Sequence, residues 1–178
     1  MTTDDLAGRK ALIKASGIKT GRILDVGIGK CGCMSFFLAG KGFNVIGIDH
    51  FPKAVHDSRK KAKNKKFKGS FEARLGNAED LPFMDNEFDA VSAYHTLHHL
   101  KHVQRGVDEM FRVCKEGGPI LIADLNEKGR KVYEHEPDEG RFLKSLEKAI
   151  SAHTDRIRKI EDCCNLMLIC VKNSKKRK

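Results

Sequence analysis

The sequence has no long apolar run. Its hydrophobic stretches are short and are interrupted by Gly, Lys or Asp, so none approaches the roughly 18 residues that a membrane span requires. The opening stretch, MTTDDLAGRK, also lacks the apolar core of a secretory signal. These two absences lead us to expect a cytoplasmic protein with no membrane partner.

Paired C-x-x-C spacing is absent too, although the chain has six cysteines. In an otherwise ordinary globular composition, their spacing predicts reduced thiols rather than a disulfide framework. Two closely spaced pairs could together bind a soft metal, but we expect buried or bystander thiols and no metal. The six are Cys31, Cys33, Cys114, Cys163, Cys164 and Cys170.

Internal repeats and linkers rich in Pro, Gly or Ser are also missing. A chain of 178 residues fits one domain, which would bury roughly two-thirds of the surface of its unfolded form. We therefore expect a single domain over residues 1–172 and a basic disordered tail at 173–178.

The net charge of +10 is concentrated in two short segments. Residues 59–68 carry seven basic side chains and residues 172–178 carry five, and neither segment contains an acid. The remainder of the chain is close to neutral. We interpret the first segment as the exposed face of a helix and the second as a solvated end, so nucleic acid is the less favoured partner.

Short apolar runs alternate with amphipathic stretches along the chain. The clearest helix is predicted over residues 100–115, where Val103, Val107 and Phe111 fall on one apolar face. Repeated strand–helix–strand units of this kind predict a doubly wound parallel sheet with helices on both faces. The predicted buried strands are residues 22–26, 43–48, 71–75, 88–93 and 120–123.

The end of the chain follows a different pattern. Residues 156–160 and 166–171 form two further apolar runs, and the stretch between them, EDCCN, is too short for a crossover helix. We therefore predict an antiparallel hairpin. The expected fold is α/β: a Rossmann-like, doubly wound, mostly parallel seven-stranded sheet that ends in this hairpin.

A glycine-rich loop, Asp25-Val-Gly27-Ile-Gly29-Lys-Cys-Gly32, follows the first predicted strand. Glycines allow a sharp turn and a close approach of the backbone to a ligand, and the next helix offers unpaired N–H groups to an anion. The G-x-G-x-x-G spacing is shared with sites for nicotinamide dinucleotides. Asp25 favours a different ligand, because its carboxylate would repel a pyrophosphate and attract an ammonium group.

Asp49 closes the second predicted strand, about 20 residues beyond the glycines. A carboxylate at this place can accept hydrogen bonds from both hydroxyls of a ribose, which indicates a nucleoside without identifying it. The alternative is an ordinary helix-capping role before Pro52.

Several segments, in the same order, resemble the class I S-adenosylmethionine-dependent methyltransferases, and the resemblance extends over nearly the whole chain. Within that family, the segments resemble the branch of the ubiquinone and menaquinone biosynthesis methyltransferases. They are ILDVGIG at 23–29, VIGID at 45–49, GNAEDLPF at 76–83, FDAV at 88–91, LHHL at 97–100 and RVCKEGG at 112–118.

This resemblance implies S-adenosylmethionine as the cofactor. It places the methionine moiety against the start of the glycine loop, the ribose against the acid at the end of the second strand, and the adenine edge against residues 77 and 78. The implied cofactor contacts are Asp25, Gly27, Gly29, Gly32, Asp49, His50, Phe51, Asn77, Ala78 and Tyr94.

Two positions depart from the family pattern. Gly32 comes one residue later than the third glycine of the usual G-x-G-x-G, which changes the path of Lys30 and Cys31 around the ligand. Asn77 replaces the commoner Asp, so a side-chain oxygen remains for the adenine amino group but a negative charge is lost.

The family's reaction is an in-line displacement at a methyl group on sulfur, for which a strong base is optional. Residues just after the fourth strand could take a proton from the acceptor, and we predict His95 and His98 as the catalytic residues. A metal site is the alternative if the helix began early, because four histidines would then share a face, but after these histidines the chain supplies no nearby carboxylate ligand before Asp108. The candidate bases are Tyr94, His95, His98 and His99, and the fourth histidine on that face is His102.

Two absences narrow the choice of acceptor. No N-P-P-[YF] follows the fourth strand, and no Pro-Cys or Thr-Cys nucleophile occurs, so the known motifs of base-methylating enzymes are missing. We expect a small-molecule acceptor, with RNA or protein as the alternative. A non-catalytic S-adenosylmethionine-binding subunit is a further alternative, and a nicotinamide oxidoreductase is the least favoured. No insertion caps the acceptor side, so a homo-oligomer or a partner subunit could complete the pocket.

Overall fold

The computed structural model describes residues 3–135 and 140–173, with side chains from residue 6 onward. The basic tail predicted at 173–178 therefore lies outside the described residues, apart from Asn173. Among the helices in the described ranges, none is long and apolar enough to pass through a membrane.

The described residues contain a seven-stranded sheet with the strand order β3-β2-β1-β4-β5-β7-β6. The first five strands of this order are parallel, and β7 is antiparallel to both of its neighbours. The predicted mostly parallel sheet with a reversed C-terminal hairpin is thus confirmed. The strands are β1 (Arg22–Val26), β2 (Asn44–Asp49), β3 (Ser70–Leu75), β4 (Ala90–Tyr94), β5 (Pro119–Leu125), β6 (Ile157–Glu161) and β7 (Asn165–Val171).

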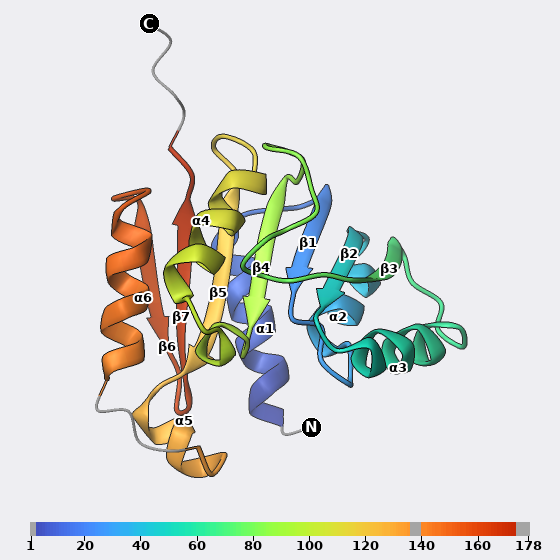
Figure 1. Ribbon diagram of the computed structural model, residues 1–178. Helices are drawn as coiled ribbons and strands as arrows, with labels where there is room; N and C mark the ends of the chain where they lie inside the picture. Colours follow the sequence, from blue (N-terminus) through green and yellow to red (C-terminus); the bar gives the residue numbers. More distant parts are fainter. Residues whose placement is uncertain (1–2, 136–139, 174–178) are drawn as a thin grey trace, which may run out of the picture.

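Helices cover both faces of the sheet (Figure 1). The first three helices pack on one face, α4 and α6 pack on the other, and α5 follows β5 at the lower edge of the view. The helices are α1 (Thr3–Ser16), α2 (Cys33–Lys41), α3 (Pro52–Ala62), the 3-10 turn η1 (Leu97–His99), α4 (Val103–Val113), α5 (Glu127–Val132) and α6 (Arg141–Ser151).

Alternate residues along the strands divide the core into two layers. On β1, Leu24 and Val26 pack with side chains of α4 and α6, whereas Ile23 packs with those of α1 and α2. The carboxyl ends of the parallel strands meet at the lower edge in Figure 1. Ligands of open α/β sheets bind at this edge, so the fold itself indicates where a site should lie.

The start of α4 differs from the prediction. The helix begins at Val103 rather than at residue 100, because Leu100 is extended, with ψ of 142°, and cannot continue η1 into the helix. The apolar face is as predicted, since Val107 and Phe111 are buried against the sheet.

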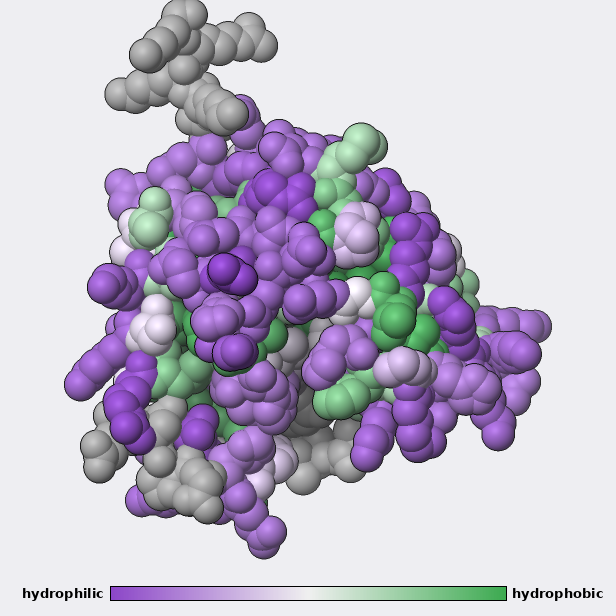
Figure 2. All heavy atoms as spheres, viewed as in Figure 1, coloured by the Kyte–Doolittle hydropathy of each residue, from purple (hydrophilic) through white to green (hydrophobic). Residues whose placement is uncertain are grey.

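The basic segment at residues 59–68 is only partly helical, contrary to the prediction. α3 ends at Ala62, and residues 63–68 form a turn and irregular chain that leads to β3. Like charges spaced one helical turn apart disfavour a longer helix here. The segment is nevertheless largely exposed, and Figure 2 shows a hydrophilic surface over α3 at the right of the molecule.

The prediction of reduced thiols is wrong for one pair. Cys31 and Cys33 form a disulfide at the turn that leads into α2, with the left-handed Gly32 between them. The second close pair does not form a disulfide, and the Cys163 thiol donates a hydrogen bond to the Cys164 sulfur at 3.1 Å. Within the ranges the structure describes, no three His, Cys, Asp or Glu side chains are placed to hold a metal ion.

Candidate functional site

A cavity of about 790 Å³ lies at the carboxyl edge of the parallel strands. The segments that follow β1, β2, β3 and β4 all contribute to its wall, which explains why its residues are scattered along the sequence. The lining residues are Gly27, Gly29, Lys30, Ile48, Asp49, His50, Phe51, Lys53, Ala54, Gly76, Asn77, Ala78, His95, Thr96, His99 and Leu100.

The first two glycines of the loop have different local roles. Gly27 has φ of +79° and donates its N–H to the Ile48 carbonyl at 2.8 Å, and a Cβ at this position would overlap Thr96. Gly29 has φ of +59°, and a Cβ there would meet no atom within 4 Å. Gly27 thus allows β1 and β4 to pack closely, whereas Gly29 leaves open space beside the cavity.

Gly32 does not line the cavity. It caps the N-terminus of α2 in a left-handed conformation, and a Cβ there would meet the Phe36 ring. Its position in the structure is therefore that of a turn residue, which is consistent with its displaced place in the glycine pattern.

Asp25 also lies outside the cavity wall. Its carboxyl group is fully buried between α2 and β4 and accepts hydrogen bonds from the Ser35 hydroxyl at 2.5 Å and the Ser92 hydroxyl at 2.7 Å. Burial raises the pKa of Asp25 to about 6, and the two hydroxyls and the charge of Arg9 oppose this rise.

Asp49 stands at the end of β2, and each of its carboxylate oxygens accepts a hydrogen bond from a backbone N–H group. One oxygen accepts the Gly29 N–H at 2.9 Å and the other accepts the Phe51 N–H at 3.0 Å. Each oxygen can accept a further hydrogen bond, so the group can still bind two hydroxyls from the cavity. The adjacent His50 and Phe51 rings are 3.7 Å apart at their centres, and Phe51 is 60% exposed.

Asn77 and Ala78, which follow the neighbouring strand β3, also line the cavity. The Asn77 side-chain oxygen accepts the Glu79 N–H at 3.0 Å, so any ligand amino group must share that oxygen with the backbone. The preceding Gly76 donates its N–H to the Asp49 carbonyl at 3.0 Å, which fixes the two walls relative to each other.

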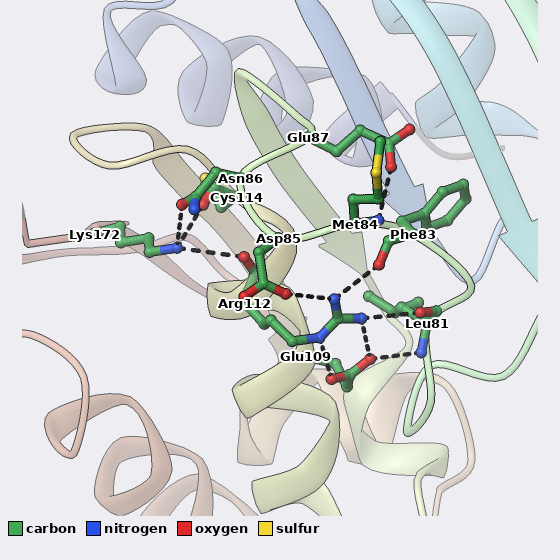
Figure 3. Close-up of polar contacts among 10 residues, drawn as sticks. All are labelled: Leu81, Phe83, Met84, Asp85, Asn86, Glu87, Glu109, Arg112, Cys114 and Lys172. Atoms are coloured by element: carbon green, nitrogen blue, oxygen red, sulfur yellow. Dashed lines mark hydrogen bonds and ion pairs between the residues drawn. The ribbon is translucent and has the colours of Figure 1, made fainter.

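The segment after Ala78 is fastened to α4 by Arg112 (Figure 3). The guanidinium donates to the carbonyl oxygens of Leu81 at 2.9 Å and Phe83 at 2.7 Å, and it forms a two-pronged ion pair with Glu109. Glu109 also accepts the Leu81 N–H at 2.6 Å. Hydrogen bonds to Glu109 and Asp85 raise the pKa of Arg112 above its ordinary value. The LPF and RVCK segments of the sequence therefore meet in one network.

The histidines after β4 do not share a helical face. His95 precedes η1, and His102 precedes α4 with φ of −127° and ψ of 86°, which is not helical. His95 and His99 line the cavity, and burial lowers the pKa of His99, helped by the neighbouring His98. Tyr94 does not line the cavity, because it packs with the opposite core layer.

His98 turns away from the cavity lining and pairs with Asp124 at the end of β5. The His98 Nδ1 and Asp124 Oδ1 atoms are 2.5 Å apart, and the two side chains are 5% and 1% exposed. Asp124 also accepts the His98 backbone N–H at 3.2 Å. The structure thus separates the two histidines predicted as catalytic, with only His95 at the cavity.

Sequence reasoning missed the partners of both histidines. Asp124 binds His98, and Asn165 lies 2.5 Å from His95 through its side-chain oxygen and the ring Nε2. Asp124 could have been predicted as a residue near the site, because it is an acid at the carboxyl end of a buried strand. Asn165 gave no comparable signal, because it stands at the start of the reversed strand β7 and far along the chain.

A family model described as a methyltransferase domain matches residues 24–122, which is more than half of the chain. The chain belongs to this methyltransferase family. The match begins in β1 and ends in β5, so it contains every segment that lines the cavity.

Curated relatives and solved structures agree with this assignment. A ubiquinone/menaquinone biosynthesis C-methyltransferase from Geobacter sp. is 29% identical over 126 residues, which are 68% of this chain and 53% of the relative. The chain spans about half the length of the curated relatives it matches.

Two solved structures share the fold. A SAM-dependent methyltransferase from Methanosarcina mazei has a TM-score of 0.70 at 23% identity, covering 91% of this chain and 97% of that chain. A Haloferax volcanii chain solved in complex with a methyltransferase activator has a TM-score of 0.70 at 16% identity, covering 95% and 90% of the two chains.

The cofactor of this methyltransferase domain is S-adenosylmethionine, and the residues of the cavity fit it. Asp49 retains acceptor capacity toward the cavity, and the open space at Gly29 would be filled by any side chain. Ile48, Ala78 and Leu100 supply apolar wall for a purine ring.

Proposed function

We propose that this chain transfers a methyl group from S-adenosylmethionine to a small-molecule acceptor. The observation that carries the proposal is one continuous cavity with Asp49 and the glycine loop on one wall and His95 and His99 on another. A nucleoside held by the first wall would direct its sulfur end toward the second.

S-adenosylmethionine supplies a reactive methyl group on a positively charged sulfur. Asp49 binds the ribose hydroxyls, and the backbone at Gly27 and Gly29 lies against the methionine end. Leu100 and Thr96 exclude water beside the histidines, so that the acceptor is held close to the methyl group in a partly dry space. His95 stands where the acceptor must lose its proton.

The curated relatives support the choice of acceptor class. The Geobacter relative is named as a C-methyltransferase of quinone biosynthesis, and a phenol or hydroquinone ring fits the proposal best. RNA and protein acceptors are the alternatives, and a labelled-methyl assay on phenols, hydroquinones, tRNA and peptides distinguishes them. Transfer to tRNA alone would overturn the choice of a small molecule.

Cofactor binding is tested separately by calorimetry on Asp49 variants. Asp49→Ala should weaken S-adenosylmethionine binding by about 1–3 kcal/mol, because the ribose hydroxyls lose their acceptor. Asp49→Asn should lose less, since the amide oxygen still accepts one bond. Asp155→Ala removes an exposed acid outside the cavity and serves as the control. Tighter binding of a nicotinamide dinucleotide than of S-adenosylmethionine would refute the proposal.

A further inference from the structure

We propose that Asp162 and Asn165, from the C-terminal hairpin, hold His95 in the tautomer that carries its proton on Nε2 and presents an unprotonated Nδ1 to the cavity. Nδ1 is then the atom that takes the acceptor's proton. Asn165 is a positioning residue in this arrangement. The role of Nδ1 as proton acceptor rests on the proposed methyl transfer. The tautomer of His95 depends only on the contacts of the hairpin.

Asp162 fixes which way the Asn165 amide points. The Asn165 Nδ2 group donates to both Asp162 carboxylate oxygens at 3.0 Å. One of these oxygens also accepts the backbone N–H groups of Cys164 at 2.9 Å and Asn165 at 2.7 Å. Because a carboxylate only accepts hydrogen bonds, the nitrogen of the amide must face Asp162. The amide oxygen therefore faces His95.

The amide oxygen in turn determines the tautomer of the ring. It lies 2.5 Å from His95 Nε2, and an amide oxygen cannot donate, so Nε2 must carry the hydrogen. In a neutral imidazole the other nitrogen, Nδ1, then has a free lone pair. Among the described residues, Nδ1 has no hydrogen-bond partner, while His95 lines the cavity.

The backbone conformation and the neighbouring rings hold the His95 side chain in one position. His95 has φ of +53°, a left-handed conformation that costs energy in a residue with a Cβ, and its N–H is tied to the Ala123 carbonyl at 2.8 Å. The ring packs beside Tyr94 and Tyr133, with centres 4.6 Å and 6.1 Å away. Asn165 itself is 3% exposed, so water does not compete for its bond to the ring.

The proton step balances with this arrangement. For a hydroxyl acceptor, the O–H bond breaks and its proton goes to Nδ1, while an electron pair of that oxygen forms the new bond to the methyl carbon. For a ring-carbon acceptor, a π pair of the ring forms the carbon–carbon bond, and the proton of that carbon then goes to Nδ1 as the C–H pair restores the ring. The pair of the breaking carbon–sulfur bond stays on sulfur, which becomes neutral. The positive charge lost from sulfur appears on the imidazolium, which the Asn165 oxygen stabilises through Nε2–H.

The test is the tautomer of His95, read by long-range proton–nitrogen correlation spectra of the full chain labelled with nitrogen-15 in histidine. At about pH 8, where imidazoles are neutral, the wild type should show the Nε2–H form. Asn165→Ala should lose this preference. The other histidines in the same spectrum report whether the fold is intact, and Asn173→Ala, two residues beyond the end of β7, is the matched control.

A double variant that exchanges the acid and the amide, with no change in net charge, distinguishes loss of the contact from misfolding. In the double variant Asp162→Asn with Asn165→Asp, the new amide donates to the new carboxylate, and the carboxylate accepts from Nε2–H. This variant should restore the Nε2–H form. An Nδ1–H form in the wild type, or an unchanged tautomer in Asn165→Ala, would overturn the inference even if S-adenosylmethionine binds. Failure of S-adenosylmethionine to bind, with the tautomer as expected, would instead overturn the proposed function.

Discussion

The Asp25 carboxyl shows how a single residue of the glycine motif affects the whole fold. Its pKa is raised from 3.8 to about 6 because burial penalises the charged form more than the hydrogen bonds from Ser35 and Ser92 favour it. Below about pH 4 the group is protonated in both the folded and unfolded states. As the pH rises through 6, the folded state must ionise a buried group, and stability is lost.

This loss of stability with rising pH leads to a prediction for Asp25→Asn. The two serine hydroxyls can each donate or accept, so an amide can replace the carboxyl without an unpaired group. The substitution should raise the free energy of unfolding by up to about 3 kcal/mol at pH 7.5 and by little at pH 4. Urea unfolding at both pH values measures this, with Asp155→Asn as an exposed control. A larger gain at pH 4 than at pH 7.5 would contradict the assignment.

The site residues that the sequence located correctly at the cavity are those that directly follow a strand. Asp49 is the last residue of β2 and His95 directly follows β4, and parallel strands bring their carboxyl ends together. The sequence did not place Tyr94 away from the cavity, because one residue decides which layer a side chain enters. It also could not pair His95 with Asn165, since that contact depends on where the hairpin docks.

At the scale of elements, the predicted strands and helices differ from the structure mostly at their ends. β4 begins at Ala90 rather than at residue 88, because Phe88 makes only an isolated bridge to Cys114. The apolar periodicity locates an element, but its first residue depends on contacts with other segments. The hairpin was predictable because its connection was too short for a helix.

The glycine loop allows a paired prediction that separates stability from binding. Gly27→Ala adds a methyl group that overlaps Thr96 in a left-handed conformation, and should lower the free energy of unfolding by about 2–4 kcal/mol. Gly29→Ala meets no neighbour and should cost only about 1 kcal/mol.

The two variants should rank in the opposite order for cofactor affinity, measured on the folded protein: the variant that loses less stability should lose more affinity. Gly29→Ala puts a methyl group into open space beside the cavity, so S-adenosylmethionine affinity should fall at least tenfold by calorimetry. The methyl group of Gly27→Ala meets Thr96 instead, so the folded fraction of that variant should lose less affinity. Equal losses of stability in both variants would show that Thr96 yields to the added methyl group.

At the scale of the whole molecule, the excess positive charge is concentrated in two short segments, residues 59–68 and 172–178. Residues 174–178 carry four basic side chains, and removing them should leave S-adenosylmethionine affinity within about twofold, because the cavity-lining residues all lie before residue 101 and salt screens charges that do not line the site. Calorimetry tests this. Elution from heparin should shift to lower salt, as fewer phosphate-like contacts are made.

The matched control for the deletion removes the same charge elsewhere. It replaces four lysines of the segment between α3 and β3 by alanine: Lys63, Lys65, Lys66 and Lys68. If either variant abolished S-adenosylmethionine binding, the charge would belong to the site and the choice of a small-molecule acceptor would need revision.

The insertion of β7 between β5 and β6 imposes an order on the assembly of the protein. The segments that form the cofactor walls all lie before residue 101, whereas the side chain that aligns His95 is at position 165. During synthesis the nucleoside-binding half emerges first, and the free edge of β5 stays unpaired until the last strand arrives. The walls of the cofactor site and the contact that aligns His95 therefore come from parts of the chain that are synthesised at different times.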